Sequence, residues 1–299
     1  MMRFRLRHVT TYRYARPVKL GRHRLMLRPR DSHEMKLHAA TLTITPAPSQ
    51  VVWQYDVFSN SVAMVEFATE ALELTIESSL DVERFPFAAI EYMVPDHARS
   101  LPLAYSADEI RDLAGLQERH VSDPDHAVDT WAKEFLASGR NGNGEAETIG
   151  VLNAISNAMH DAFCYVPRDA YGTQSPIDTL VRRSGTCRDY AYLMMETARS
   201  LGLAARFVSG YLYDAGRDAG GSGQVPNAAA GATHAWAQVY LPGAGWTHFD
   251  PTNDLVADAA LIPVAVVREP GQASPVAGVF NGTTSDFLGM EVAVDVTSL

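Results

Sequence analysis

Residues 184–190 read Ser-Gly-Thr-Cys-Arg-Asp-Tyr, and the chain that follows them has the spacing of a buried helix. Apolar and small residues recur at helical intervals from Tyr190 to Leu201, and Gly202 is a natural helix end. The segment therefore predicts a helix that begins at or beside Cys187. The glycine before it permits close approach of another part of the backbone.

A cysteine in this position is a candidate nucleophile. The start of a helix favours the thiolate form, and its free backbone N–H groups can hold an oxyanion. Asp189 lies in the first turn, where its charge suits the helix dipole. A buried structural cysteine is the alternative interpretation for Cys187. The other cysteine, Cys164, lacks these features and is interpreted as a packing residue.

A cysteine nucleophile needs a base and a group that orients the base. Two histidines lie downstream of it, His234 and His248. An alternating stretch begins at His234, a turn signal covers residues 242–245, and the returning strand ends at Asp250. The pattern predicts a hairpin that brings His234 and Asp250 onto neighbouring strands.

The length of the hairpin loop decides whether these two side chains meet. A four-residue loop places Asp250 opposite Ala237, and the side chains of His234 and Asp250 then point to opposite faces. A three- or five-residue loop, or a bulge, places them on one face. If His234 and Asp250 form a pair, the hairpin must have this second arrangement. His248 is an alternative base, because it points to the same face of its strand as Asp250. The other interpretations are a half-buried strand histidine and a turn aspartate before proline.

The rest of the chain divides into two patterns. Up to about residue 93, short alternating or β-branched segments predict an antiparallel β-sandwich; they are residues 3–14, 40–45, 51–58, 62–68 and 72–80. Beyond the prolines at 95 and 102, the spacing becomes helical at 108–117, 126–137 and 146–163. The fold class is therefore α+β, with a boundary near residue 100. A Gly- and Ala-rich stretch at 215–231 is interpreted as a flexible loop.

Composition excludes several classes of protein. The 299 residues include 25 basic and 35 acidic ones, a formal charge of −10, so a nucleic-acid partner is not expected. Residues 1–36 hold eleven Lys and Arg against two acids. Because these alternate with apolar residues, a solvated strand face is favoured over a polyanion-binding arm.

Location and ligands follow from what the sequence lacks. It contains no apolar run typical of a membrane span or a secretory signal, and two cysteines are too few for a disulfide scaffold. We expect a cytoplasmic protein with free thiols and no membrane partner. The sequence has no zinc-site spacing and no P-loop, so neither a metal nor a cofactor is expected.

Several blocks in the second half of the chain resemble the bacterial transglutaminase-like superfamily. They are Gly-Thr-Cys-Arg-Asp-Tyr-Ala at 185–191, Ala-Arg-Phe-Val-Ser-Gly-Tyr at 205–211, His-Ala-Trp at 234–236, Gly-Trp at 245–246 and Phe-Asp-Pro-Thr-Asn at 249–253. The resemblance covers roughly residues 145–255. It implies a papain-like core, helices packed on an antiparallel sheet, in which Cys187, His234 and Asp250 form a catalytic triad.

The first region resembles the accessory region of the same family. The matching blocks are Thr-Tyr-Arg-Tyr at 11–14, Pro-Val at 17–18, Leu-Arg-Pro-Arg at 27–30 and Asp-Val-Phe-Ser-Asn at 56–60. The resemblance thus implies an accessory β domain at residues 1–100 and a transglutaminase-like catalytic domain at 101–299. The sequence departs from the family pattern at 267–272, where acidic and aromatic positions have changed.

The resemblance also implies a reaction, acyl transfer through a thioester on Cys187. His234 is expected as base and then acid, with Asp250 holding its imidazole. Tyr165 is expected to help the backbone hold the oxyanion, and Trp236 and Trp246 to wall the cleft. The expected substrate is a peptide or protein with a carboxamide or amide bond. Relatives described as cysteine proteases favour hydrolysis; transamidation to an amine and a non-catalytic peptide-binding scaffold are the alternatives.

Overall fold

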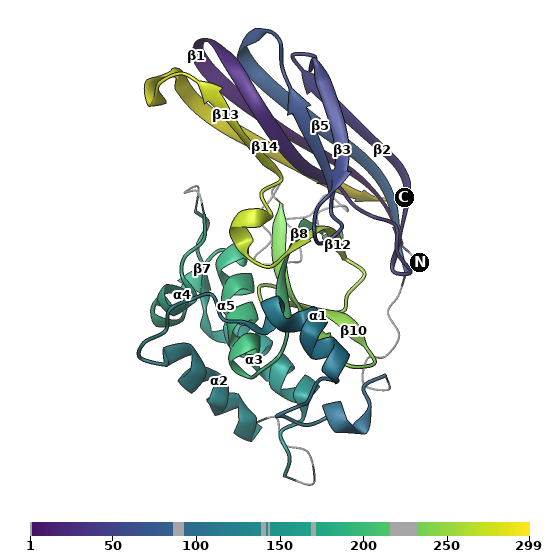
Figure 1. Cartoon of the computed structure of the whole chain (residues 1–299), viewed down its shortest axis with the longest axis vertical. Coiled ribbons are helices and arrows are strands. Elements are labelled where there is room, and N and C mark those ends of the chain that lie inside the picture. The colour runs from purple at the N-terminus through teal and green to yellow at the C-terminus, as the bar shows by residue number, and fades with distance from the viewer. Residues whose placement is uncertain (1, 86–92, 139–141, 143, 169–171, 216–232) are drawn as a thin grey trace.

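The computed structural model describes residues 2–85, 93–138, 142, 144–168, 172–215 and 233–299. The predicted loop at 215–231 therefore lies outside the described residues except for Ala215. The molecule has an all-β region above a core of helices and strands (Figure 1). Among the described helices, none has both the length and the apolar character needed to cross a bilayer.

One curved antiparallel sheet forms the β region. Its strands are β1 (Met2–Arg28), β2 (Met35–Thr45), β3 (Gln50–Tyr55), β4 (Ser61–Glu66), β5 (Glu70–Arg84), β13 (Val276–Asn281) and β14 (Phe287–Ser298). The strand order is β2-β5-β1-β4-β3, and β13 and β14 also pair with β1. The predicted α+β class with an antiparallel N-terminal β region is confirmed; in place of the expected two-layer β-sandwich, the described strands of this region form one sheet. The sheet is a half-barrel because the 27-residue β1 pairs with different strands along its two halves.

The basic side chains near the N-terminus lie on the solvent-exposed face of β1 in this sheet. Phe4 and Leu6 are buried in β1, whereas Arg3, Arg5 and Arg7, which alternate with them, face solvent. Arg3 lies 2.7 Å from the carboxylate of Asp81, and Arg7 lies 2.7 Å from that of Glu77. The predicted solvated strand face is confirmed, since the alternation of a half-buried strand places every second side chain outward.

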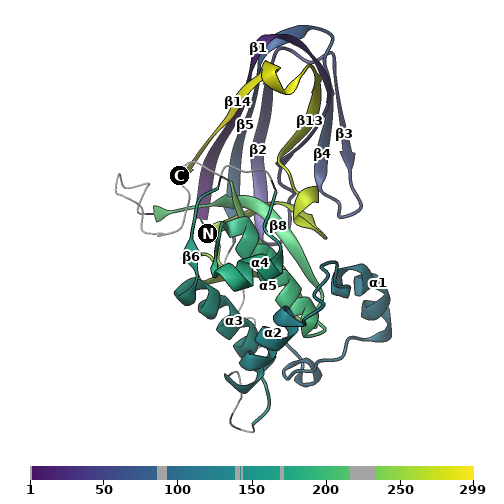
Figure 2. The ribbon, with the colours of Figure 1, turned by 90° about the vertical axis from the view of Figure 1, so that its left-hand side faces the viewer.

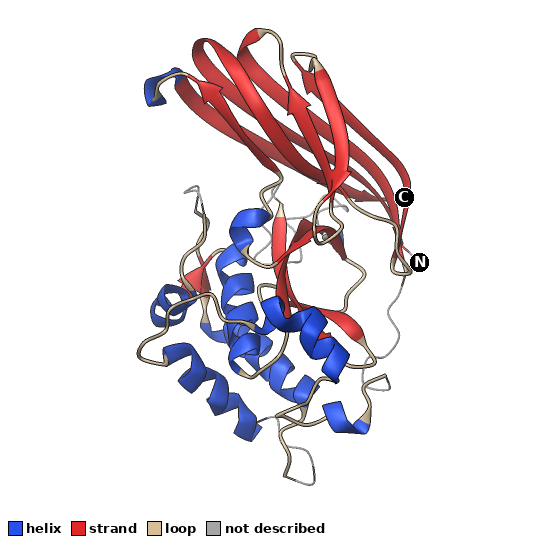
Figure 3. Cartoon of the chain, viewed as in Figure 1, coloured by secondary structure: helices blue, strands red, loops and turns tan. Residues whose placement is uncertain are grey.

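The core contains the helices α1 (Ala107–Gln117), α2 (Ala127–Ser138), α3 (Thr148–Ala162), α4 (Pro176–Arg182) and α5 (Cys187–Ser200). It also contains a sheet of order β11-β10-β9-β8-β12, made of β8 (Ala205–Leu212), β9 (His234–Leu241), β10 (Gly245–Asp250), β11 (Leu255–Val256) and β12 (Leu261–Val267). Figure 3 distinguishes the helices (blue) from the strands (red). The predicted helices agree with α1, α2, α3 and α5; α4 was not predicted.

Helix α5 lies at the centre of the core, beside β8 (Figure 2), and it contacts both β8 and β9. Most of its residues are buried, among them Leu193, Met194 and Ala198, which have no exposed surface. Such a helix is covered on all sides, because neighbouring elements contact each of its faces. The start of α5, and the thiol there, is therefore held by a rigid scaffold.

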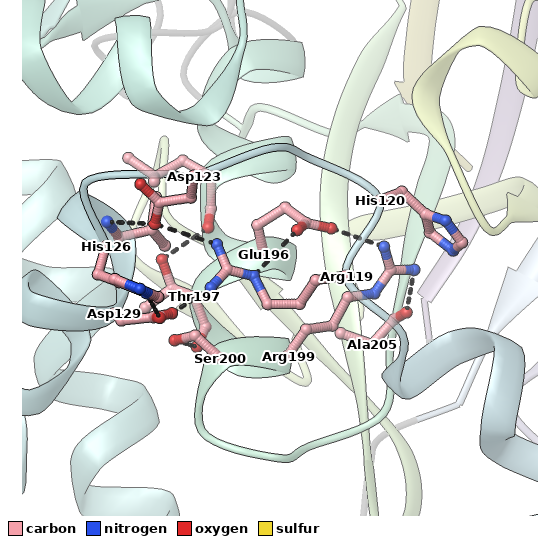
Figure 4. A network of polar contacts seen from close by, with 12 residues as sticks. Arg119, His120, Asp123, His126, Asp129, Glu196, Thr197, Arg199, Ser200 and Ala205 are labelled. Carbon is pink, nitrogen blue, oxygen red and sulfur yellow. Dashed lines mark hydrogen bonds and ion pairs between the residues drawn. The ribbon is translucent and has the colours of Figure 1, made fainter.

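A buried polar network ties α5 to the segment between α1 and α2 (Figure 4). Arg199 donates to the Glu196 carboxylate at 2.7 Å, and both side chains have no exposed surface. Arg119 lies 3.6 Å from the same carboxylate and also pairs with Asp123 and Asp129. The ion pairs and hydrogen bonds of this network take the place of the water that would otherwise solvate these charged side chains.

The predicted division near residue 100 stays a prediction. Residues 276–298, which that division assigns to the second region, pair with β1 in the first. The chain therefore leaves the sheet after β5, builds the core, and returns to the sheet with its last two strands.

Candidate active site

The start of α5 is fixed by the carboxylate of Asp189. Its Oδ2 accepts hydrogen bonds from the backbone N–H and the hydroxyl of Thr186, at 2.8 and 2.9 Å. Its Oδ1 accepts from the backbone N–H of Gln174 at 2.6 Å and from Arg168 at 2.9 Å. Burial alone raises the pKa of Asp189, but these donors outweigh it and hold the pKa below its ordinary value. This side chain therefore fixes the turn that presents Cys187.

The β9–β10 hairpin has the register that a His234–Asp250 pair requires. Gly245 lies opposite Leu241 and Phe249 opposite Ala237, so the loop has three residues, 242–244. Side chains at even positions then share one face of the two strands. Nε2 of His234 lies 2.8 Å from Oδ2 of Asp250. The two groups are 6% and 0% exposed, so water does not screen their interaction.

The carboxylate of Asp250 is oriented by the turn that follows it. The backbone N–H of Thr252 donates to Oδ1 at 3.0 Å, and the side-chain amide of Asn253 donates to Oδ2 at 2.8 Å. Asp250 is thus both a turn residue and the partner of His234. Sequence reasoning did not single out Asn253, although it closes the Phe-Asp-Pro-Thr-Asn block.

The environment of His234 favours its charged form. Burial lowers the pKa of His234, but the charge and hydrogen bond of Asp250 outweigh burial and raise the pKa to about 10. The hydrogen bond and the charge of the neighbouring Cys187 make a smaller contribution to this rise. The imidazole therefore lies between a carboxylate and a thiol that is 6% exposed at the start of α5.

Tyr165 also reaches the thiol. It lies in the short strand β6 (Cys164–Tyr165), which pairs in parallel with β7 (Ser184–Gly185), directly before α5. Burial raises the pKa of Tyr165 above its ordinary value, and the charge and hydrogen bonding of Cys187 raise it further. Cys164 was interpreted as a packing residue, and this is wrong. Its side chain is exposed because β6 places alternate residues on opposite sides.

Trp236 does not wall an open cleft as expected, because it has no exposed surface. Its ring stacks on that of His234 with centroids 5.8 Å apart, and its indole N–H donates to Nδ1 of His248 at 2.6 Å. Trp246 lies at the other end of the hairpin, opposite Tyr240, and the guanidinium of Arg206 packs over it, 4.0 Å from its ring centroid. Trp236 therefore supports the imidazole of His234 from inside the core.

His248 faces the β region. Its Nε2 lies 2.9 Å from the side-chain amide of Gln238 and 3.5 Å from the carboxylate of Glu34. Burial lowers the pKa of His248 despite the opposing charge of Glu34, which agrees with a neutral ring that accepts from Trp236. The expected alternative base thus has its ring nitrogens occupied by other partners.

The arrangement brings a thiol, an imidazole and a carboxylate together, as nucleophilic catalysis requires. In the described part of the chain, no group of three or more His, Cys, Asp or Glu side chains could hold a metal ion. The residues that the structure gathers are Cys187, His234, Asp250 and Tyr165; those it places elsewhere or fully inside the core are Trp246 and Trp236.

Comparison with known proteins finds relatives along almost the whole chain. A protein of Mycobacterium tuberculosis described as uncharacterized is 29% identical over 306 aligned positions, which cover 98% of this chain and 92% of the relative. A protein of Mycobacterium leprae, also described as uncharacterized, is 27% identical over the whole of both chains. The crystal structure of a candidate cysteine protease from Cytophaga hutchinsonii superposes with a TM-score of 0.69 at 20% identity, covering 100% of this chain and 91% of that one, and shows the same fold.

Two families match separate parts of the chain. Residues 4–83 match the bacterial transglutaminase-like N-terminal region, which corresponds to β1–β5. Residues 135–251 match the transglutaminase-like superfamily and contain the gathered thiol, imidazole and carboxylate. The two matches thus identify residues 135–251 as a transglutaminase-like domain and residues 4–83 as the N-terminal region of the bacterial transglutaminase-like kind.

Proposed function

We propose that this protein is a thiol-dependent enzyme that transfers an acyl group from an amide to water, as a peptidase or amidase. The observation that carries the proposal is the position of the His234 imidazole. It lies 2.8 Å from the Asp250 carboxylate and beside the thiol of Cys187, in a site almost closed to water. The transglutaminase-like domain and the cysteine-enzyme fold support it.

The proposed reaction has two stages. The Cys187 thiolate attacks the amide carbonyl, and the imidazolium of His234 gives its proton to the leaving amine, which leaves a thioester. Water then attacks the thioester while His234 takes its proton, and the carboxylic acid is released with the Cys187 thiolate and the His234 imidazolium restored. Asp250 keeps the imidazole oriented and stabilises its charge. The raised pKa of His234 supports this role, because it supplies a proton donor at neutral pH.

The oxyanion of each tetrahedral intermediate needs donors near the thiol. The backbone N–H of Cys187 is at the start of a helix, where such groups have no partner within the helix. The hydroxyl of Tyr165, beside the same thiol, is the second donor in this proposal. A peptide or protein with an amide bond is the proposed substrate.

The first test is the alkylation rate of Cys187 with iodoacetamide as a function of pH, followed by mass spectrometry. Cys164→Ala serves as the background, because the exposed thiol of Cys164 would also react. We expect reaction of Cys187 near neutral pH and a rate at least about tenfold lower in His234→Ala. Reaction only above about pH 8.5, unchanged by His234→Ala, would overturn the proposal.

A second test separates the acyl acceptors. Glutamine-containing peptides are incubated with a labelled primary amine, and ammonia, peptide cleavage and amine incorporation are followed together. Cleavage or ammonia release without incorporation supports hydrolysis. Incorporation of the amine makes the protein a transglutaminase. Binding of peptides without turnover, with Cys187 unreactive, makes it a peptide-binding scaffold.

A further inference from the structure

Two of the free strand edges of the half-barrel belong to strands that follow one another in the chain, β2 and β3. Strands β2 and β3 stand at opposite ends of the order β2-β5-β1-β4-β3, although only residues 46–49 connect them. Within the described residues, β2 pairs with β5 alone and β3 with β4 alone. Figure 2 shows β3 at the outer edge of the sheet. Each of these strands therefore keeps one row of backbone N–H and C=O groups without a strand partner.

A groove of about 670 Å³ lies between these two edges. Most of the residues that line it are apolar. They include the alternate residues Ala40, Leu42 and Ile44 of β2 and Val51, Trp53 and Tyr55 of β3; Gln54 of β3 lines it as well. Leu42 and Ile44 also pack against the buried residues of the half-barrel. The groove therefore opens the apolar interior of the sheet to solvent, in a part of the molecule separate from Cys187.

The exposure of β3 is unusual for a strand with large apolar side chains. All six of its residues are exposed, and Trp53 and Tyr55 are 46% and 73% exposed. Natural sheets protect their edges with charges, proline or short length, since an exposed apolar edge pairs readily with another chain. The connection 46–49 contains two prolines, but β3 itself contains no proline and no charged residue. This edge has the properties of a binding surface.

Two arginines supply positive charge at one end of the groove. The guanidinium of Arg28 lies 5.9 Å from the centre of the Trp53 ring, and that of Arg30 lies 5.7 Å from the centre of the Tyr55 ring. Among the described residues, neither forms an ion pair with a carboxylate, whereas Arg3 and Arg7 of the same strand region do. The residues that line the groove include Arg28 but no Asp or Glu. The charge at this end is therefore available to an anionic group.

We propose that this groove binds an extended peptide segment with apolar side chains at alternate positions and acidic side chains at the end that meets Arg28 and Arg30. The peptide adds a strand to the free edge of β3, and its backbone hydrogen bonds supply affinity. Its apolar side chains enter between β2 and β3, because alternate side chains of a strand share one face. The guanidinium groups, already held over aromatic rings, select the acidic end. This site is additional to the proposed enzyme activity.

The test uses fluorescein-labelled peptides that match the six residues of β3 in length. In the first probe, valine and threonine alternate and glutamate replaces valine at one end; a second probe has the order reversed, because an added strand can run either way. A third probe carries lysine in place of glutamate. Fluorescence anisotropy measures each dissociation constant for the full chain at low and at physiological salt.

We expect one of the two glutamate probes to bind, with the lysine probe at least about tenfold weaker. Trp53→Ala and Arg28→Glu should each weaken binding at least about tenfold, since both side chains contact the proposed ligand. Lys133→Glu is the matched control: it makes the same charge change on the exposed side of α2 and should leave binding within about twofold. An unchanged alkylation rate of Cys187 shows that each variant is folded.

Other outcomes overturn the proposal. Failure of both glutamate probes to bind, or equal binding by the Trp53→Ala and Arg28→Glu variants, excludes this peptide site. Tighter binding of an oligothymidine at the same salt concentration identifies the groove as a nucleic-acid site. Self-association that Trp53→Ala abolishes, measured by sedimentation equilibrium, identifies a second copy of the chain as the occupant.

Discussion

Glu196 provides a sharp test of how the core tolerates enclosed charge. Its carboxylate lies 2.7 Å from Arg199 and 3.6 Å from Arg119, and its side chain has no exposed surface (Figure 4). Burial lowers the pKa of Arg199, and the charge of Glu196 opposes this effect. In Glu196→Ala, the guanidinium of Arg199 keeps its charge but loses its buried anionic partner.

The expected cost follows from that geometry. Removal of one partner from a buried ion pair costs about 3–5 kcal/mol, and Glu196→Ala should lose an amount in this range. Arg199 retains hydrogen bonds of 2.9 Å to the carbonyl oxygens of Leu116, Ala205 and Arg268, which limit the loss. Glu196→Gln keeps an oxygen acceptor near Arg199 but no charge. It should cost less, about 1.5–3 kcal/mol, the contribution of a hydrogen bond to a charged group.

Urea unfolding followed by circular dichroism measures both variants against the wild type. Glu134→Ala is the control: it removes a carboxylate from an exposed position of α2 and should change the free energy of unfolding by less than about 0.5 kcal/mol. A loss below about 1 kcal/mol in Glu196→Ala would refute the reasoning, since the enclosed guanidinium would then need no anionic partner. If the Ala and Gln variants lose equal free energies of unfolding, the side-chain oxygen that Glu196→Gln retains does not stabilise Arg199.

Three further predictions concern the site and its support. Because the pKa of His234 rises from 6.5 to about 10 on folding, its charge adds stability that is complete below pH 6.5 and lost as pH rises through 10. The unfolding free energy of the wild type relative to His234→Gln should therefore shrink over this range; a difference that grows contradicts it. Asp189→Asn should cost about 1–3 kcal/mol and slow alkylation of Cys187, and a variant with wild-type stability and rate excludes the anchoring role. Gly210→Ala should cost about 1–3 kcal/mol in chemical unfolding, because its Cβ would collide with the carbonyl of Ile262 and the Trp236 ring; unchanged stability means that these neighbours can move.

Local pattern predicted the elements that hold the candidate site. The helix at Cys187 follows from apolar spacing and a glycine end, and the structure has it at Cys187–Ser200. The hairpin was predicted too, but its register was left open between loop lengths. One residue more or less in a loop moves every side chain to the other face, and turn residues alone do not specify the count. The loop length of three residues, and with it the register of the hairpin, is therefore known only from the structure.

Contacts between distant segments could not be predicted in this way. Glu34 approaches His248 across the boundary between the sheet and the core, and nothing near either residue indicates the other. The same holds for Asp189, whose place in the first helical turn suggested a dipole interaction. Its hydrogen bonds to Gln174 and Arg168 join residues that lie 15 and 21 positions apart in the chain, a separation over which local pattern predicts no contact.

The pairing of β1 with β14 has a consequence for how the molecule can be divided. Phe4 lies opposite Ser298, and the backbone N–H of Leu299 donates to the carbonyl of Arg3 at 2.9 Å. In topological terms, the core is an insertion into the sheet and is tethered to it at both ends. A cut at residue 100 would strip β1 of two neighbouring strands and leave the excised core with β13 and β14 as an unpaired, aggregation-prone tail. A separable core would instead end before β13, near residue 275.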